Sequence, residues 1–101
     1  MESDQHALGP VLTHLRDLLP ELQERYAVDT LEVFGSQARG DAGHRSDIDV
    51  LVTFRETPDL LTFIALEDEL SDQLGARIDL VMRRSLKPRL RDRILAEAVP
   101  V

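Results

Sequence analysis

The spacing of hydrophobic and polar residues predicts a long helix in the first quarter of the chain. From about Pro10 to Tyr26, apolar residues recur at steps of three and four, which is typical of an amphipathic helix. Pro20 lies inside this stretch and is expected to kink the helix or to split it in two, because proline lacks the amide that a helix needs. The apolar positions are Leu8, Val11, Leu12, Leu15, Leu19, Leu22 and Tyr26.

Three later segments are predicted to form strands. Residues 30–34 are partly β-branched and are followed by Gly35. Residues 48–54, with the sequence IDVLVTF, are apolar on both faces, which is typical of a strand in a sheet covered by helices. Residues 77–82, with the sequence RIDLVM, form the third predicted strand.

Two further helices are predicted around the third strand. Thr57, Pro58 and Asp59 supply a cap, a first-turn proline and a first-turn acid, which together predict a helix start. Gly75 is expected to end this helix, and Pro88 is expected to open the last one. The predicted buried positions are Leu60, Phe63, Ile64, Leu70 and Leu74 in the first helix and Leu90, Ile94 and Leu95 in the second.

The order of these elements predicts the fold class. With a short helix after residue 36, the order is helix, strand, short helix, strand, helix, strand, helix. Such alternation predicts an α/β (α+β) fold in which a small mixed sheet is flanked by helices. Since 101 residues fit one domain, we expect a single domain over residues 1–101.

Composition excludes several kinds of protein. The chain has no cysteine, which excludes disulfides, thiolate chemistry and cysteine zinc sites. No apolar run approaches the roughly 20 residues that a membrane span needs, and residues 1–10 do not resemble a signal peptide. We therefore expect no membrane partner, and the absence of cysteine is compatible with a cytoplasmic location.

Charge is unevenly distributed along the chain. Residues 1–76 carry 16 acidic and 5 basic side chains, whereas residues 77–101 carry 3 acidic and 7 basic ones, and the whole has a net charge of −7. The acidic total disfavours direct binding of nucleic acid. A solvated helix face is expected for the basic cluster, and contact with phosphates or an acidic partner is the alternative. The cluster comprises Arg83, Arg84, Lys87, Arg89, Arg91 and Arg93.

Three aspartates are the candidate metal ligands. Asp47 and Asp49 are two positions apart at a predicted strand start, so their side chains point to one face. If the second and third strands are neighbours, Asp79 lies about 5 Å away. Three close carboxylates need a cation among them, and their oxygens favour Mg²⁺ or Mn²⁺. The alternative is that Asp79, within an apolar strand, is paired with Arg39 or Arg77.

A glycine-serine segment precedes these aspartates. Gly35 ends a strand where the backbone must approach a ligand closely. Ser36 is expected to cap a short helix, whose free amides suit a phosphate group, and Arg39 is expected to contact phosphates or an aspartate. Together with the acids, this segment predicts transfer of a phosphoryl or nucleotidyl group, which needs mainly positioning and charge neutralisation. Asp79 is the candidate proton acceptor.

The motif resembles that of a known family. Gly35 and Ser36, ten intervening residues, the pair Asp47 and Asp49, and a later aspartate resemble the nucleotidyltransferase superfamily of DNA polymerase beta. The segment FGSQARGDAGHRSDIDVLV is similar to the minimal nucleotidyltransferase (MNT) family. This resemblance implies that the turn at residues 35 and 36 holds the triphosphate of ATP or another nucleoside triphosphate. The aspartates then hold Mg²⁺, with Asp79 as a ligand or as the base.

The resemblance, which covers about residues 20–100, also implies a biological role. Many MNT proteins are encoded beside a HEPN-domain ribonuclease toxin and act as its antitoxin, in some cases by attaching AMP to a tyrosine of the toxin. Because the chain is short, we expect a partner protein to bring the acceptor hydroxyl. One alternative is an antitoxin that neutralises its partner by direct binding, although three convergent acids favour catalysis. An enzyme acting on a nucleic-acid end or a small molecule is disfavoured by length and charge.

Overall fold

The computed structural model describes residues 8–35, 38 and 47–101. Its strands are β1 (Val28–Phe34), β2 (Ile48–Phe54), β3 (Ile78–Met82) and β4 (Val99–Pro100). They form one sheet in the order β3-β2-β1-β4. β1 pairs antiparallel with β2 and β4, whereas β2 and β3 pair in parallel. The predicted mixed sheet is therefore confirmed, and β4 is an additional strand.

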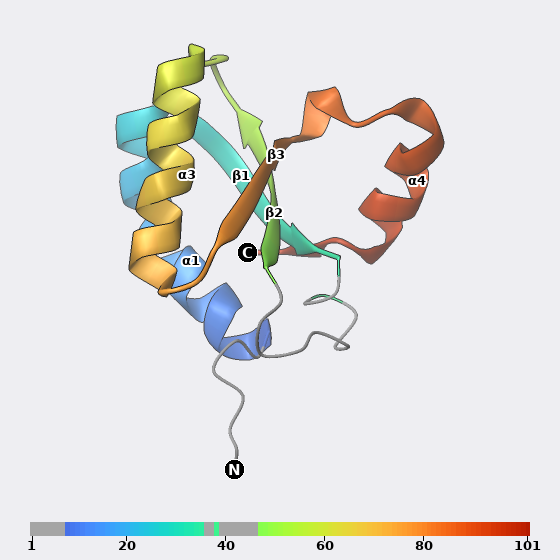
Figure 1. Ribbon diagram of the computed structural model, residues 1–101, viewed down its shortest axis with the longest axis horizontal. Coiled ribbons are helices and arrows are strands. Elements are labelled where there is room, and N and C mark those ends of the chain that lie inside the picture. The colour runs from blue at the N-terminus through green and yellow to red at the C-terminus, as the bar shows by residue number, and fades with distance from the viewer. Residues whose placement is uncertain (1–7, 36–37, 39–46) are drawn as a thin grey trace.

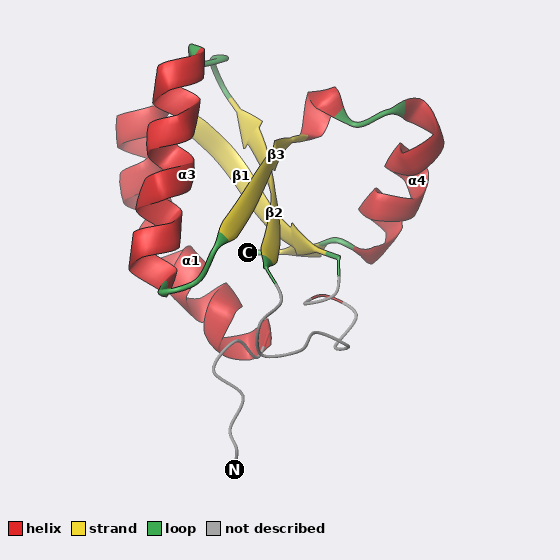
Figure 2. Cartoon of the chain, viewed as in Figure 1, coloured by secondary structure: helices red, strands yellow, loops and turns green. Residues whose placement is uncertain are grey.

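Helices lie on both sides of this sheet. α1 (Leu8–Tyr26) and α3 (Leu60–Leu74) lie together on one side, and α4 (Pro88–Glu97) lies on the other (Figure 1). A short 3-10 turn, η1 (Arg83–Ser85), joins β3 to α4. The colouring by secondary structure shows the resulting order of layers, two helices, sheet and one helix (Figure 2). Within the described part of the chain, no helix has the length and apolar character needed to cross a bilayer.

The core lies between the sheet and the pair formed by α1 and α3. Every second residue of a strand faces it, because side chains alternate between the two faces of a sheet. Aliphatic side chains supply almost all of this packing. The opposite face is not wholly polar, because Phe34 and Leu51 alternate with the core positions and are also buried. The buried cluster comprises Val11, Leu15, Leu22, Val28, Leu31, Val33, Ile48, Val50, Val52, Leu66, Leu70, Ile78 and Leu80.

α1 continues across Pro20 as one helix, so the expectation of two separate helices is wrong. An internal proline costs a helix about 3 kcal/mol or more. On the two sides of Pro20, Leu15 and Leu22 are 0% and 1% exposed. Burial of such side chains contributes about 1.5–3 kcal/mol each. Packing of both halves on the same sheet therefore holds the helix together.

The ends of α3 show which capping signal acts. Asp59, and not Thr57, is the N-cap, and its side chain accepts a hydrogen bond from the amide of Thr62 at 2.8 Å. This hydrogen bonding lowers the pKa of the Asp59 carboxyl. Gly75 ends the helix in the left-handed conformation, with φ 63°, as predicted.

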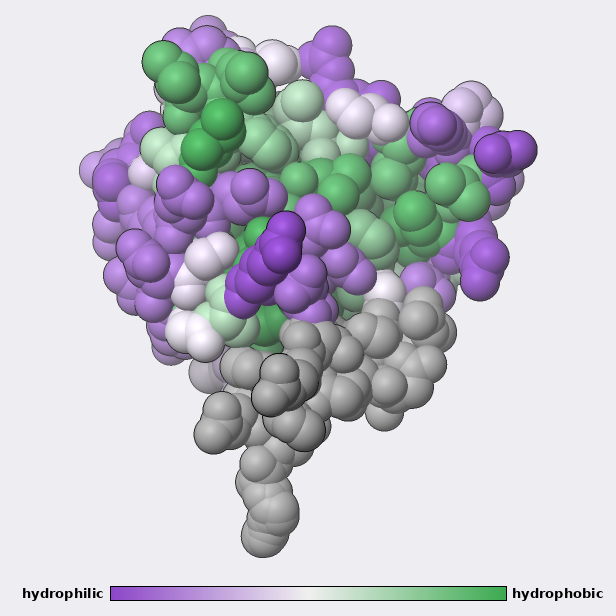
Figure 3. Space-filling view, viewed as in Figure 1, coloured by the Kyte–Doolittle hydropathy of each residue, from purple (hydrophilic) through white to green (hydrophobic). Residues whose placement is uncertain are grey.

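The buried face of α3 differs from the predicted stripe. Leu60 and Ile64, which were expected to be buried, are 72% and 42% exposed, whereas Leu66 and Leu70 are fully buried. The space-filling view shows apolar surface over the start of α3, where Leu61 is also exposed (Figure 3). The repeat of leucines at four-residue steps sets the buried face. Leu60 and Leu61 in the first turn therefore lie to the side of the buried face and remain exposed.

Two side chains of α3 accept hydrogen bonds from backbone amides on the outer edge of β3. Ser71 Oγ accepts a hydrogen bond from the amide of Ile78 at 3.1 Å, and Glu67 Oε2 accepts one from the amide of Leu80 at 2.9 Å. Unpaired amides on an edge strand are otherwise open to water or to another chain. The two bonds also hold the backbone on both sides of Asp79.

α4 packs on the rest of the molecule less closely than the other helices. None of its residues is buried, and Leu90, which was expected to face inward, is 42% exposed. Ile94 and Leu95 are half-buried, and the arginines of this helix are exposed. α4 is therefore held largely at its C-terminal end, where β4 joins the sheet.

Candidate active site

Asp49 and Asp79 lie side by side on neighbouring strands. They are register partners in the parallel pair of β2 and β3, and such strands are about 5 Å apart. The residues before them, Ile48 and Ile78, face the core. Both aspartates therefore point to the opposite face of the sheet. The predicted neighbourhood of residues 48–54 and 77–82 is confirmed.

Asp47 directly precedes β2, two positions before Asp49. Its Oδ2 lies 3.7 Å from Nε of Arg77, and the two side chains are 45% and 82% exposed. Exposed ion pairs contribute only about 0–1 kcal/mol. Of the two arginines considered as partners for Asp79, Arg77 thus contacts Asp47 instead, and this weak contact leaves the carboxylate accessible.

Asp79 is exposed. Its apolar neighbours Ile78 and Leu80 face the core, so Asp79 faces away from it. The Asp79 carboxylate is therefore accessible from the side of the sheet that faces away from the core.

Gly35 makes room for the carboxylate of Asp49. Phe34, the last residue of β1, is the register partner of Asp49. Gly35 follows with φ +74°, and a Cβ at this position would lie only 2.2 Å from Asp49 Oδ2. Both the left-handed backbone and this close approach require glycine. The glycine expected to admit a ligand thus already adjoins one of the predicted metal ligands.

Ser36 and Arg39 lie outside the described residues. The nucleotide contacts expected of them therefore remain predictions. Ala38, which lies between them, is helical. The rest of the short helix predicted after Ser36 lies outside the described residues, so that helix remains a prediction.

The aspartates suit a hard divalent cation, because they offer oxygen ligands and because Asp49 and Asp79 lie on the same face of the sheet. Carboxylate oxygens are the ligands that Mg²⁺ and Mn²⁺ prefer. Among residues 8–35, 38 and 47–101, however, no group of three His, Cys, Asp or Glu side chains is arranged as a complete metal site. Mg²⁺ usually takes one or two carboxylates and completes its shell with water and substrate phosphates. Adjacent Asp49 and Asp79, with Asp47 exposed beside them, fit that mode.

Glu97 contacts this site, although the motif does not include it. Its Oε1 accepts a hydrogen bond from the amide of Gly35 at 3.3 Å, across 62 positions of sequence. Glu97 is the last residue of α4. A negative charge is unfavourable there, because the C-terminal end of a helix already carries a partial negative charge. That unfavourable position is the only signal by which the sequence reveals this residue.

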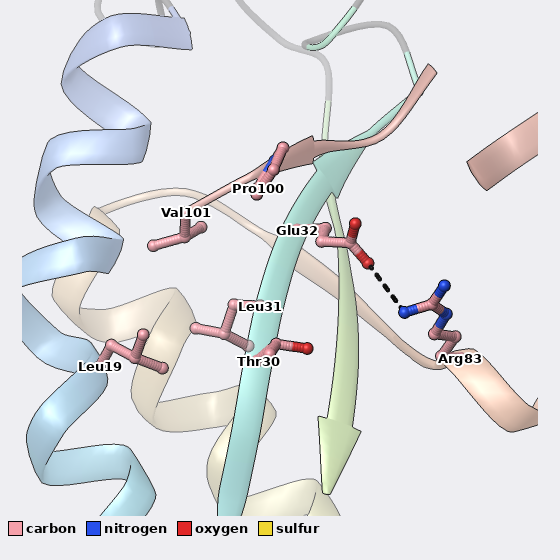
Figure 4. A pocket seen from close by; sticks show the side chains of 7 residues that line it. All are labelled: Leu19, Thr30, Leu31, Glu32, Arg83, Pro100 and Val101. Atoms are coloured by element: carbon pink, nitrogen blue, oxygen red, sulfur yellow. Dashed lines mark ion pairs between the residues drawn. The ribbon is translucent and has the colours of Figure 1, made fainter. Parts of the chain in front are cut away.

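A cavity of about 190 Å³ lies farther along β1. In it, Glu32 Oε1 is buried without a hydrogen-bond partner among the described residues and lies 3.9 Å from Nη1 of Arg83 (Figure 4). None of the predicted site residues lines this cavity, so it is separate from the aspartates. Its lining consists of Leu19, Thr30, Leu31, Glu32, Arg83, Pro100 and Val101.

Comparison with known proteins adds independent information. The family described as "Nucleotidyltransferase domain" matches residues 15–101, a range that contains all six predicted site residues. The chain is 51% identical over 81 residues to "Protein adenylyltransferase MntA" of Thermococcus cleftensis, a match that covers 80% of this chain and 82% of that protein.

Solved structures with the same fold are also similar in sequence. A chain assigned as a minimal nucleotidyltransferase has a TM-score of 0.79 and 40% identity, and the match covers 94% of this chain and 96% of that one. A chain of a toxin-antitoxin complex with AMP-PNP has a TM-score of 0.67 and 26% identity, with 92% and 70% covered. AMP-PNP is an analogue of ATP.

Proposed function

The chain belongs to the nucleotidyltransferase domain family and is a nucleotidyltransferase, and from that premise we propose that it transfers AMP from ATP to a hydroxyl group of a partner protein. The proposed partner is a HEPN-domain toxin, for which this chain acts as the antitoxin. The 51% identical relative is named a protein adenylyltransferase, which supports the reaction. A similar chain in a toxin-antitoxin complex with AMP-PNP supports a role in a toxin-antitoxin pair and an adenine nucleotide as the substrate.

The pairing of Asp49 and Asp79 beside Gly35 is the observation that carries the proposal. Transfer forms a bond between the acceptor oxygen and the α-phosphorus of ATP, while the bond from that phosphorus to pyrophosphate breaks. The proton of the acceptor hydroxyl must leave at the same time. Asp79 is exposed beside Asp49, so it is the proposed proton acceptor.

The proposed cofactor is Mg²⁺ or Mn²⁺. Asp47, Asp49 and Asp79 would hold it, and a bound cation supplies neutralisation of phosphate charge and polarisation of phosphoryl oxygens. The turn formed by Gly35 and Ser36 is proposed to hold the triphosphate, together with Arg39. These roles follow the resemblance of the motif to the MNT family.

Mass spectrometry of the partner tests the proposal. The purified chain is incubated with Mg²⁺, ATP and the protein encoded by the neighbouring gene, and the intact mass of that protein is measured. We expect a gain of one or more AMP groups, which is lost in the double variant Asp47→Ala, Asp49→Ala. Asp72→Ala, an exposed position on α3, is the matched control and should behave as wild type.

The other outcomes distinguish the alternative function. Neutralisation of the partner without any change in its mass would favour an antitoxin that acts by direct binding. A mass gain that persists in the double variant would contradict the role given to the aspartates.

A further inference from the structure

Gly35 lies between two carboxylates. On one side, Glu97 Oε1 accepts a hydrogen bond from its amide at 3.3 Å. On the other side, Oδ2 of Asp49 fills the space that a Cβ of residue 35 would need. Two segments that are far apart in the sequence thus meet at this one glycine.

The strand that follows Glu97 fixes its place. The two residues of β4 pair with residues 32 and 33 of β1, and the amide of Val101 donates to the carbonyl of Leu31 at 3.1 Å. Figure 1 shows the end of α4 returning to the end of β1 at this point. Glu97 ends α4 two positions before β4, so the pairing of β4 with β1 holds it close to Gly35.

The helix itself gives no reason for an acid at this position. The C-terminal end of a helix carries a partial negative charge, which disfavours a carboxylate there. The last turn of α4 contains no basic residue. Hydrogen bonds with a charged acceptor are about twice as strong as neutral ones. The hydrogen bond that the Gly35 amide donates to Glu97 therefore offsets part of an unfavourable placement at the helix end.

We propose that Glu97 is a positioning residue that fixes the Gly35 peptide for binding of the nucleotide. Glycine loses more conformational freedom on ordering than any other residue, so an unrestrained turn at Gly35 must be ordered when ATP binds. The hydrogen bond that the Gly35 amide donates to Glu97 orders this peptide beforehand, in a conformation that leaves space for Asp49. The inference rests on the proposed function, because ATP is the ligand that it concerns.

Titration of ATP in the presence of Mg²⁺ tests this role without the need for an acceptor. Calorimetry gives Kd for the wild type and for variants at position 97. Glu97→Ala should raise Kd about tenfold, the size of one lost hydrogen bond. Glu97→Gln keeps an oxygen acceptor at the same reach and should stay within about threefold of wild type. Asp92→Asn, at an exposed position of the same helix, should leave Kd unchanged.

A second variant separates position from charge. Glu97→Asp keeps the charge but withdraws the carboxylate by one methylene, so it should weaken binding about as much as Glu97→Ala. Wild-type affinity in Glu97→Asp would assign the effect to charge and overturn the positioning role. Unchanged or tighter binding in Glu97→Ala would overturn it as well, because the carboxylate would then be idle or compete with phosphate.

Two controls keep the result decisive. Thermal unfolding of each variant separates loss of the fold from loss of binding, and if Glu97→Ala does not fold, the comparison of Glu97→Gln with Glu97→Asp decides alone. A wild-type chain that binds no ATP would contradict the proposed function itself. If the wild type and every variant at position 97 bind ATP with the same Kd, only the role of Glu97 is contradicted.

Discussion

Replacing Asp49 with asparagine should lower the rate of AMP transfer by about 10²–10³-fold or more, the loss seen when one preorganised electrostatic contact to a reacting group is removed. Asparagine has the same shape as aspartate, so the contact with Gly35 is retained while the charge is lost. Asp49 is the register partner of Asp79 and adjoins Gly35, so it lies at the centre of the site. Incorporation of labelled AMP into the partner protein measures the effect.

Asp29→Asn is the matched control for this variant. Asp29 is exposed on β1, so the substitution should leave both the rate and the free energy of unfolding nearly unchanged. Full transfer activity in Asp49→Asn would show that the carboxylate is not part of the reaction.

Replacing Gly35 with alanine should impair both stability and transfer. The left-handed backbone at φ +74° costs a residue with a Cβ about 1–2 kcal/mol. The overlap of that Cβ with Asp49 Oδ2, at 2.2 Å, adds to this cost or displaces the carboxylate. We expect a total loss of about 2–5 kcal/mol in the free energy of unfolding, because overpacking typically costs about 1–3 kcal/mol more. Urea denaturation measures it.

Gly75→Ala provides the matched comparison. Gly75 has a similar φ of +63°, but nothing lies within 4 Å of an added Cβ. This variant should lose only the backbone contribution and should transfer AMP at the wild-type rate once folded. Equal effects of the two substitutions on stability and transfer would contradict the importance of the contact between Gly35 and Asp49.

The sequence predicts the elements that carry Asp49 and Asp79 because these elements have strong local patterns. The bounds of β2 are those expected, since IDVLVTF is a continuous apolar strand segment. The period of the strands then places Asp49 and Asp79 on one face once β2 and β3 are neighbours. These relations require only local periodicity and one correct strand pairing.

Other features depend on contacts between distant segments. β4 has only two residues, too few for any periodic pattern, and it forms because β1 offers an edge. The predicted buried face of α3 is confirmed at Phe63, Leu70 and Leu74. It is wrong at Leu60 and Ile64, which continue the apolar pattern without reaching the core. Glu97 joins the site through a hydrogen bond that spans 62 positions, which no local pattern encodes.

Binding of Mn²⁺ in the presence of AMP-PNP tests the carboxylate site most directly. Electron paramagnetic resonance measures the fraction of free Mn²⁺ as protein is added, and it needs neither an acceptor nor turnover. Wild-type protein should bind Mn²⁺ in a manner that depends on the nucleotide, and Asp49→Asn and Asp79→Asn should each lose most of that binding. Equal, nucleotide-independent Mn²⁺ binding by the wild type and both variants would contradict a metal site formed by these aspartates beside Gly35.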